Sequence, residues 1–135
     1  MIKIFSDGGA RGNPGPAACA FVVFDEEKII HKENKYLGEV TNNVAEYSGV
    51  LLALNWLKKN LKGEPVNFFL DSELVVKQLN GIYKIRNKIL LDLVIQIKEI
   101  EKELGVKINY KNVPREKNKL ADKLVNNELD SRRGR

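Results

Sequence analysis

The apolar segment Val66–Leu70 restricts the folds open to this chain more than any other stretch. It is too short for a helix, and its apolar residues follow one another as in a strand that is covered on both faces of a sheet. Segments with the apolar spacing of helices precede it and follow it. A buried strand between two helices is typical of an α/β domain, and the sequence predicts that class.

The remaining segments complete this pattern. Three strand-like segments come first and are joined by turn-forming residues, which predicts a meander of antiparallel strands. Helical patterns, one more alternating strand and a closing helix follow. The expected order is βββαβααβα, a mixed five-stranded sheet flanked by helices. The expected strands are 1–5, 17–24, 29–36, 66–70 and 106–113, and the expected helices are about 41–63, 72–79, 87–103 and 120–129.

Length and composition fit one globular domain. The chain has 135 residues, of which 43% are hydrophobic and 30% are charged. This length suffices for one core, so we expect one domain over residues 1–130 and a basic tail over 131–135. Cys19 stands alone in an apolar run and is expected to be a buried structural thiol. We find no leader-like or membrane-spanning run and expect a cytoplasmic monomer with no membrane contact and no obligate protein partner.

Charge is distributed unevenly along the chain. Residues 1–76 carry a net charge of −2, whereas residues 77–135 carry +7, which gives +5 for the whole. An enzyme that binds both cations and a polyanion needs carboxylates at its centre and Lys or Arg along the substrate path. An ordinary solvated basic face explains the charge equally well.

Four carboxylates are placed at the joints between predicted elements. They are Asp7 at the end of the first strand, Glu46 at the start of the first long helix, Asp71 at the end of the buried strand and Asp122 at the start of the last helix. Such positions converge in α/β domains, and clustered carboxylates select hard divalent cations. Taken singly, each residue is better explained as a turn or helix cap, or by the helix dipole, and only the set in its sequence context favours a metal site.

Four segments surround these carboxylates in order along the chain: Asp7-Gly8-Gly9-Ala10-Arg11-Gly12-Asn13-Pro14-Gly15-Pro16-Ala17, Thr41-Asn42-Asn43-Val44-Ala45-Glu46-Tyr47, Asp71-Ser72 and Leu120-Ala121-Asp122. Together they resemble the successive motifs of type 1 ribonuclease H. The resemblance extends over nearly the whole chain, its first two motifs are long and specific, and the expected order of strands and helices is similar to that of the family.

The resemblance implies a ribonuclease H-like fold and an endonuclease that cuts the RNA strand of RNA–DNA hybrids. Asp7, Glu46, Asp71 and Asp122 match the family's acidic ligands for two ions of Mg²⁺ or Mn²⁺. The implied reaction is a two-metal hydrolysis that leaves 5′-phosphate and 3′-hydroxyl ends. The alternative is a non-catalytic module of the same fold that binds hybrids or double-stranded RNA.

By the same resemblance, Gly8, Gly9, Asn13, Asn42 and Asn43 match positions that meet the minor groove of the hybrid. The 2′-hydroxyl group distinguishes RNA from DNA there. Thr41 matches a position that holds a phosphate of the DNA strand. Turn formation and helix capping are the alternative for these Asn and Thr residues, and both roles are compatible.

The chain departs from the family in the loop 113–119, where many members have a histidine. Arg115 is the closest substitute, because a guanidinium can bind a phosphate, although it cannot act as a general base. The only histidine, His31, lies far away in the third predicted strand and is expected to be structural.

Other departures concern the grip on substrate. Some members have a basic, Trp-containing insertion where this chain has the short connection 80–88. Within it, Tyr83 and its cationic neighbours either meet the substrate or are a buried tyrosine with solvated cations. Glu73 replaces a glutamine of some relatives and is expected to serve the first turn of its helix. Trp56 is expected to pack against the core.

Overall fold

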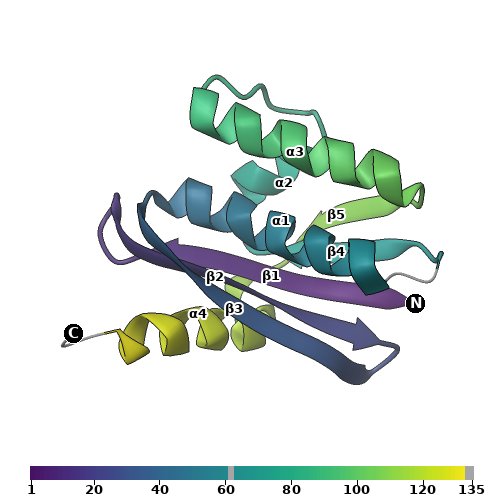
Figure 1. Cartoon of the computed structure of the whole chain (residues 1–135), viewed down its shortest axis with the longest axis horizontal. Helices are drawn as coiled ribbons and strands as arrows, with labels where there is room; N and C mark the ends of the chain where they lie inside the picture. Colours follow the sequence, from purple (N-terminus) through teal and green to yellow (C-terminus); the bar gives the residue numbers. More distant parts are fainter. Residues whose placement is uncertain (61–62, 133–135) are drawn as a thin grey trace.

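The computed structural model describes residues 1–60 and 63–132, and it confirms the mixed five-stranded sheet (Figure 1). The strand order is β3-β2-β1-β4-β5, with β1, β2 and β3 antiparallel and β4 and β5 parallel to β1. Helices α1 to α3 cover one face and α4 covers the other. The elements are β1 (Ile2–Ala10), β2 (Gly15–Asp25), β3 (Lys28–Val40), α1 (Asn42–Asn60), β4 (Val66–Leu70), α2 (Glu73–Leu79), α3 (Lys88–Leu104), β5 (Ile108–Asn112), the short 3-10 helix η1 (Arg115–Lys117) and α4 (Lys119–Ser131).

Helix ends follow the capping signals of the sequence. The Ser72 hydroxyl accepts the N–H of Val75 at 3.3 Å, and the Asn87 side chain accepts the N–H of Leu90 at 3.1 Å. Gly105 ends α3 in the left-handed conformation, which costs a glycine little. Local chemistry therefore sets these boundaries within a residue or two of the predicted ones.

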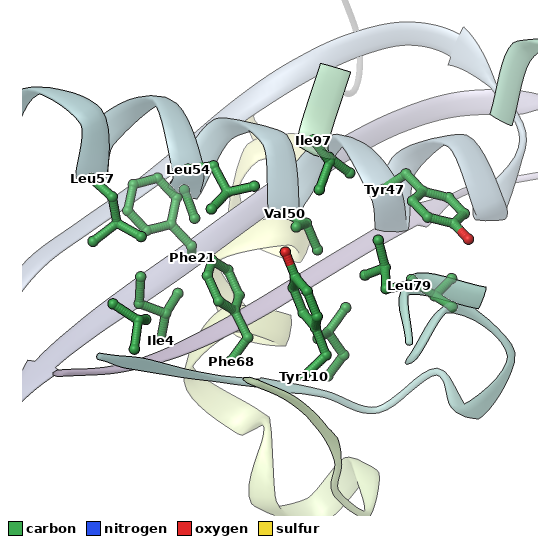
Figure 2. Packing of buried hydrophobic residues seen from close by; sticks show 14 of the residues in the cluster. Ile4, Phe21, Tyr47, Val50, Leu54, Leu57, Phe68, Leu79, Ile97 and Tyr110 are labelled. Carbon is green, nitrogen blue, oxygen red and sulfur yellow. The ribbon is translucent and has the colours of Figure 1, made fainter. Parts of the chain in front are cut away.

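The main core lies between the sheet and α1, with α3 closing it from above. Figure 2 shows Phe21 and Phe68 of the sheet facing Val50 and Leu54 of α1, and Ile97 of α3 lies close to the same group. Because α1 is enclosed by the sheet and by α3, its buried residues are spread around its circumference. A smaller cluster of Ala18, Ala20, Val125 and Leu129 joins α4 to the opposite face.

The prediction that β4 is buried on both faces of the sheet is only half right. Val66, Phe68 and Leu70 are buried toward α1, but Asn67 and Phe69 on the other face are partly exposed. The reason is that α4 packs on β1, β2 and β3 and leaves this part of the sheet open.

Strand β1 is longer than its sequence predicted. The glycine-rich stretch was expected to turn directly after Phe5, yet β1 continues to Ala10 because its residues pair with β2, where Gly8 lies opposite Cys19. Asp7 therefore lies within a strand and not at its end. The same pairing lengthens β3, whereas β5 begins two residues later and ends one residue earlier than expected.

Helix α1 rests directly on β1 at two glycines. A Cβ atom on Gly8 would lie 2.1 Å from the carbonyl oxygen of Ala45, and one on Gly49 would lie 2.8 Å from the carbonyl oxygen of Asp7. No larger residue fits at Gly8 without moving the helix. This contact fixes the distance between the strand that carries Asp7 and the helix that carries Glu46.

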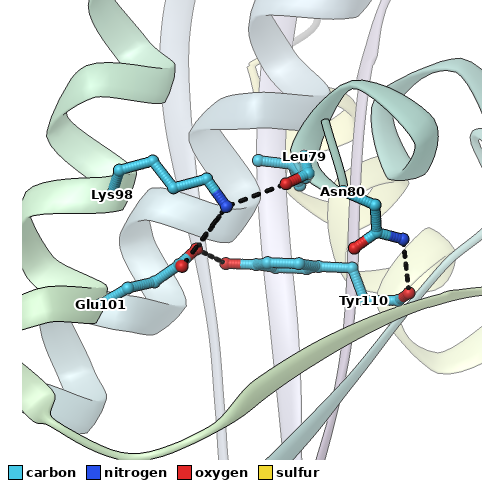
Figure 3. Close-up of polar contacts among 5 residues, drawn as sticks. All are labelled: Leu79, Asn80, Lys98, Glu101 and Tyr110. Atoms are coloured by element: carbon cyan, nitrogen blue, oxygen red, sulfur yellow. Dashed lines mark hydrogen bonds and ion pairs between the residues drawn. The ribbon is translucent and has the colours of Figure 1, made fainter. Parts of the chain in front are cut away.

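Polar contacts fix the edge strand β5 to α2 and α3 (Figure 3). The Tyr110 hydroxyl donates to Glu101 at 2.6 Å, and the Lys98 ammonium donates to the carbonyl of Leu79 at 2.8 Å. The Asn80 amide donates to the carbonyl of Tyr110 at 3.2 Å. Burial raises the pKa of Tyr110, so its hydroxyl keeps its proton and donates.

Several smaller predictions meet the structure directly. Cys19 is fully buried, and burial raises the pKa of its thiol to about 12, which confirms a structural thiol. Trp56 packs against the core, as expected. Among residues 1–60 and 63–132, none of the helices combines the length and apolar character that crossing a bilayer requires.

Two predicted segments, the first long helix and the basic tail, extend partly beyond the described residues. Helix α1 is described to Asn60, and its expected end near residue 63 includes 61–62. In the predicted tail, α4 continues to Ser131, and the Arg132 guanidinium lies 4.0 Å from the Tyr36 ring centroid. Residues 133–135 lie outside the described part, so the division at residue 130 stays a prediction.

The contact between β1 and α1 is testable by adding one methyl group. Gly8→Ala should lower the free energy of unfolding by about 2 kcal/mol or more, because the methyl group meets the backbone of α1. Gly9→Ala is the matched control in the same strand, since its Cβ would lie 3.9 Å from Val125. It should change stability by about 0.5 kcal/mol or less. Urea unfolding measures both, and equal stabilities for the two variants would contradict the proposed contact.

Candidate active site

Three of the predicted carboxylates meet just beyond the point where the parallel pairing of β1 with β4 ends. One oxygen atom from each of Asp7, Glu46 and Asp71 lies within 4.8 Å of the others. Strands β1 and β4 run in parallel, so Asp7 and Asp71 reach the same edge of the sheet. Helix α1 adds Glu46 from the position set by Gly8. Asp122 comes from the first turn of α4 and lines the adjoining cleft.

Glu46 is buried and only half satisfied by the protein. Its Oε1 accepts the N–H of Gly8 at 3.2 Å, while its Oε2 is buried without a hydrogen-bond partner in the described residues. Burial, and then the charge of Asp7, raises the pKa of Glu46. A buried carboxylate oxygen without a donor costs free energy unless a cation or a proton meets it.

The electrostatics of Asp7 point the same way. Burial, together with the charges of Asp71 and Asp122, raises the pKa of Asp7 to about 7. Like charges this close are stable in the ionised form only with a compensating cation. All the available donors are oxygens, which suits a hard divalent ion such as Mg²⁺ or Mn²⁺. The residues present therefore fit a divalent metal.

Asn118 supports the cluster, and sequence reasoning missed it. Its amide donates to Asp71 Oδ2 at 3.2 Å and to the carbonyl of Ser6 at 2.8 Å, and only 1% of the residue is exposed. The sequence signal was an asparagine four residues before Asp122, at the N-cap of α4. Asn118 makes no capping bond with its side chain and holds Asp71 against β1 instead.

The glycine-rich loop, residues 11–14 between β1 and β2, is tied to the start of α1. The Asn13 side chain accepts the N–H of Asn42 at 2.9 Å, and the Asn42 side chain accepts the N–H of Ala10 at 2.8 Å. The Thr41 hydroxyl accepts the N–H of Val44 at 3.2 Å, as a helix cap does. These bonds show the turn and capping roles that the sequence left open as the alternative for these residues. Asn43 follows in the first turn and is partly exposed.

A cleft of about 160 Å³ adjoins the carboxylates. Arg115 reaches it from η1, and Arg11 reaches it from the glycine-rich loop. The lack of a side chain on Gly8 serves the contact with α1 described above, so close approach of substrate is not needed to explain this glycine. The predicted site residues that line the cleft are Asp7, Gly8, Gly9, Asn42, Glu46, Arg115 and Asp122.

Comparison with known proteins gives the family of the chain. A profile of the family described as "Reverse transcriptase-like" matches residues 5–128. LC11-RNase H1 was isolated from compost by a metagenomic approach. Its structure in complex with an RNA/DNA hybrid superposes on this chain with a TM-score of 0.92, and the two sequences are 40% identical. The match covers 97% of this chain and 98% of that one. The chain belongs to the type 1 ribonuclease H family.

Two further ribonuclease H relatives are longer than this chain. The bifunctional protein Rv2228c of Mycobacterium tuberculosis is 38% identical over 132 residues, which are 96% of this chain and 36% of the relative. Its N-terminal RNase H domain superposes with a TM-score of 0.87. Ribonuclease HI of Halobacterium salinarum is 32% identical over 130 residues, covering 96% of this chain and 64% of that protein. The chain thus spans about a third of the mycobacterial relative.

The single histidine of this ribonuclease H chain has a structural setting. His31 stacks on Trp56 with ring centroids 4.9 Å apart, and its Nε2 lies 2.9 Å from Glu33 Oε1. These contacts agree with the structural role expected for both rings. In the loop where many family members have a histidine, Arg115 is exposed at the cleft.

Helix α2 and the short connection 80–88, where some relatives have a basic insertion, form local side-chain contacts. Glu73 forms an ion pair with Lys77 at 2.7 Å in the first turns of α2, as expected for a helix role. Tyr83 is 45% exposed, so the buried tyrosine considered from the sequence is wrong. Its hydroxyl accepts from Lys77 at 3.3 Å, which holds the ring at the surface.

Without a bound cation, Asp7→Asn should stabilise the protein above neutral pH. The folded-state pKa of Asp7, about 7, exceeds the 3.8 of an unperturbed aspartate. Its contribution to stability is therefore complete below that unperturbed value and is lost as the pH rises through the folded value. Thermal unfolding in EDTA should show a gain of about 1–3 kcal/mol at pH 8 that shrinks at pH 5.

Asp92→Asn on α3 is the control for this measurement, since Asp92 is exposed and belongs to another face. It should leave the difference between pH 5 and pH 8 unchanged. Identical unfolding of Asp7→Asn and the unaltered chain at pH 8 would show that Asp7 carries no electrostatic strain.

Proposed function

We propose that this chain is a metal-dependent endoribonuclease that hydrolyses the RNA strand of RNA–DNA hybrids, leaving 5′-phosphate and 3′-hydroxyl ends. The observation that carries the proposal is the cluster of Asp7, Glu46 and Asp71, with a buried Glu46 oxygen that lacks a protein donor. Membership of the type 1 ribonuclease H family supports the reaction, and LC11-RNase H1 is described in complex with an RNA/DNA hybrid.

In this proposal, Asp7, Glu46, Asp71 and Asp122 hold two ions of Mg²⁺ or Mn²⁺. Bound ions of this kind supply an activated water and stabilise the leaving oxygen of the phosphodiester. The protein keeps the donors in place, because Asn118 holds Asp71 and the N–H of Gly8 orients Glu46. Burial of Glu46 keeps bulk water from competing for its oxygens.

Substrate binding falls to the loop and helix start beside the cleft. Gly8, Gly9, Asn13, Asn42 and Asn43 are assigned to the minor groove, and Thr41 is assigned to a phosphate of the DNA strand. Asn42 lines the cleft, and its backbone N–H donates to the side-chain oxygen of Asn13, which ties the two residues together. Pre-organised polar groups lose little entropy when they bind a ligand, which favours recognition by shape. The monomeric state and the cytoplasmic location stay predictions.

A substrate panel tests the reaction. The chain should cut the RNA strand of a labelled hybrid with Mg²⁺ or Mn²⁺ and should not cut it in EDTA. Asp71→Asn should lower the cleavage rate by about 1000-fold or more while hybrid binding in a gel shift persists, because the change removes a metal ligand and leaves the rest of the cleft. Asp92→Asn serves as the control.

Hybrid binding without any metal-dependent cutting would favour the non-catalytic binding module instead. Substantial residual cleavage by Asp71→Asn would contradict the assignment of the ligands. Double-stranded RNA and DNA duplexes in the same panel define which duplex is accepted.

Arg115 is proposed to hold a phosphate at or beside the cleaved bond. Arg115→Ala should lower turnover on a hybrid by about 10-fold, because a charge-assisted, bidentate contact with the phosphate is lost. Lys117→Ala is the matched control, since Lys117 is an exposed cation in the same η1 and is absent from the residues lining the cleft. Single-turnover kinetics measures both, and unchanged turnover for Arg115→Ala would eliminate the role.

A further inference from the structure

Arg11 stands at the edge of the carboxylate cleft and is held there by α4. Its guanidinium Nη2 lies 2.7 Å from Asp130 Oδ1 and 3.3 Å from Asn126 Oδ1. The same residue lines the cleft with Asp7 and Asp122. Asp130, which is not part of the carboxylate cluster, therefore holds the Arg11 guanidinium beside the proposed reaction centre.

The backbone of Arg11 is fixed, so only its side chain is free to change partner. The Arg11 N–H donates to the carbonyl of Pro16 at 2.8 Å. A Cβ atom on Gly15 would lie 2.2 Å from the Arg11 carbonyl oxygen, so the loop closes tightly on itself. The loop is also tied to α1 through Asn13 and Asn42.

The ion pair that holds the guanidinium is weak. The side chain of Arg11 is 38% exposed and that of Asp130 is 56% exposed. Exposed pairs of this kind contribute about 0–1 kcal/mol. A phosphate offers a guanidinium two parallel hydrogen bonds and a higher charge, so it competes well with one carboxylate oxygen.

Arg11 and Arg115 both line the cleft, but they are anchored toward opposite ends of α4. Arg115 precedes α4, whereas Arg11 contacts Asn126 and Asp130 in its last two turns. A helix of this length is about 20 Å long. The two arginines therefore reach the cleft from different directions.

We propose that Arg11 is a substrate-binding contact that exchanges Asp130 for a backbone phosphate of the RNA strand other than the one at the cleaved bond. Asp130 then opposes binding, since it competes with the substrate for the same guanidinium. This inference rests on the proposed function, because it assigns the strand that passes the carboxylates. The contact from Arg11 in the glycine-rich loop would compensate for the short connection 80–88, which offers the substrate few cations.

The test uses the full chain and opposite changes in the two partners. Arg11→Gln should raise the KM for a hybrid about 10-fold and leave kcat within about 2-fold, because a binding contact away from the reacting atoms is lost. Its binding should depend less steeply on salt, by about one released counterion. Asp130→Asn should lower KM about 2- to 5-fold, because the guanidinium is freed.

The double variant and two controls separate this role from a structural one. Asp130→Asn should have no effect in the Arg11→Gln background, and Arg11→Lys should restore part of the affinity. Arg132→Gln removes another cation at the end of α4, where Arg132 pairs with Glu128 at 2.8 Å, and should leave KM unchanged. A purely structural ion pair predicts that Arg11→Gln and Asp130→Asn weaken binding alike, and that result would overturn the inference.

Hybrid binding is measured separately by fluorescence anisotropy in the Asp71→Asn background, where no cleavage is expected. Arg11→Gln should weaken this binding about 10-fold there, and an unchanged dissociation constant and salt slope would refute the contact. If the unaltered chain binds hybrids but cuts none, the proposed function fails while the Arg11 contact still receives its own answer.

Discussion

The direct contact of α1 with β1 is the constraint on which the rest of this structure depends. Gly8 leaves the space that the carbonyl of Ala45 occupies, and Gly49 leaves space for the carbonyl of Asp7. Because the strand and the helix touch through their backbones, Glu46 comes beside Asp7 without a long side chain having to bridge a gap. The same contact brings the core residues of α1 onto the sheet.

This packing creates an electrostatic problem that the protein alone does not solve. Burial raises the pKa values of Asp7 and Glu46, and their neighbours add further negative charge. One Glu46 oxygen stays without a donor in the described residues. A scaffold that is stabilised by close packing therefore carries a locally unfavourable site, which is typical of sites that bind cations or catalyse reactions.

Helix α4 contacts both the region of the carboxylates and the loop that carries Arg11. Its apolar residues Val125 and Leu129 pack on the sheet, its first turn carries Asp122, and its last turns hold Arg11 through Asn126 and Asp130. Asn118, just before it, fixes Asp71. Helix α4 and the residue at its N-cap therefore position Asp122, Asn118 and Arg11 around the carboxylates.

The sequence by itself determined the order of the elements and most helix ends, because apolar periodicity and caps are local properties. Its motifs, through their resemblance to a family, singled out the carboxylates. It misjudged Asp7 as a strand end, since pairing with β2 overrides the turn preference of glycine. Only the tertiary structure decided that Gly8 serves the helix contact, that Asn118 holds Asp71 and that Arg11 meets Asp130. Those contacts join residues far apart in the chain, and no local pattern encodes the distance between them.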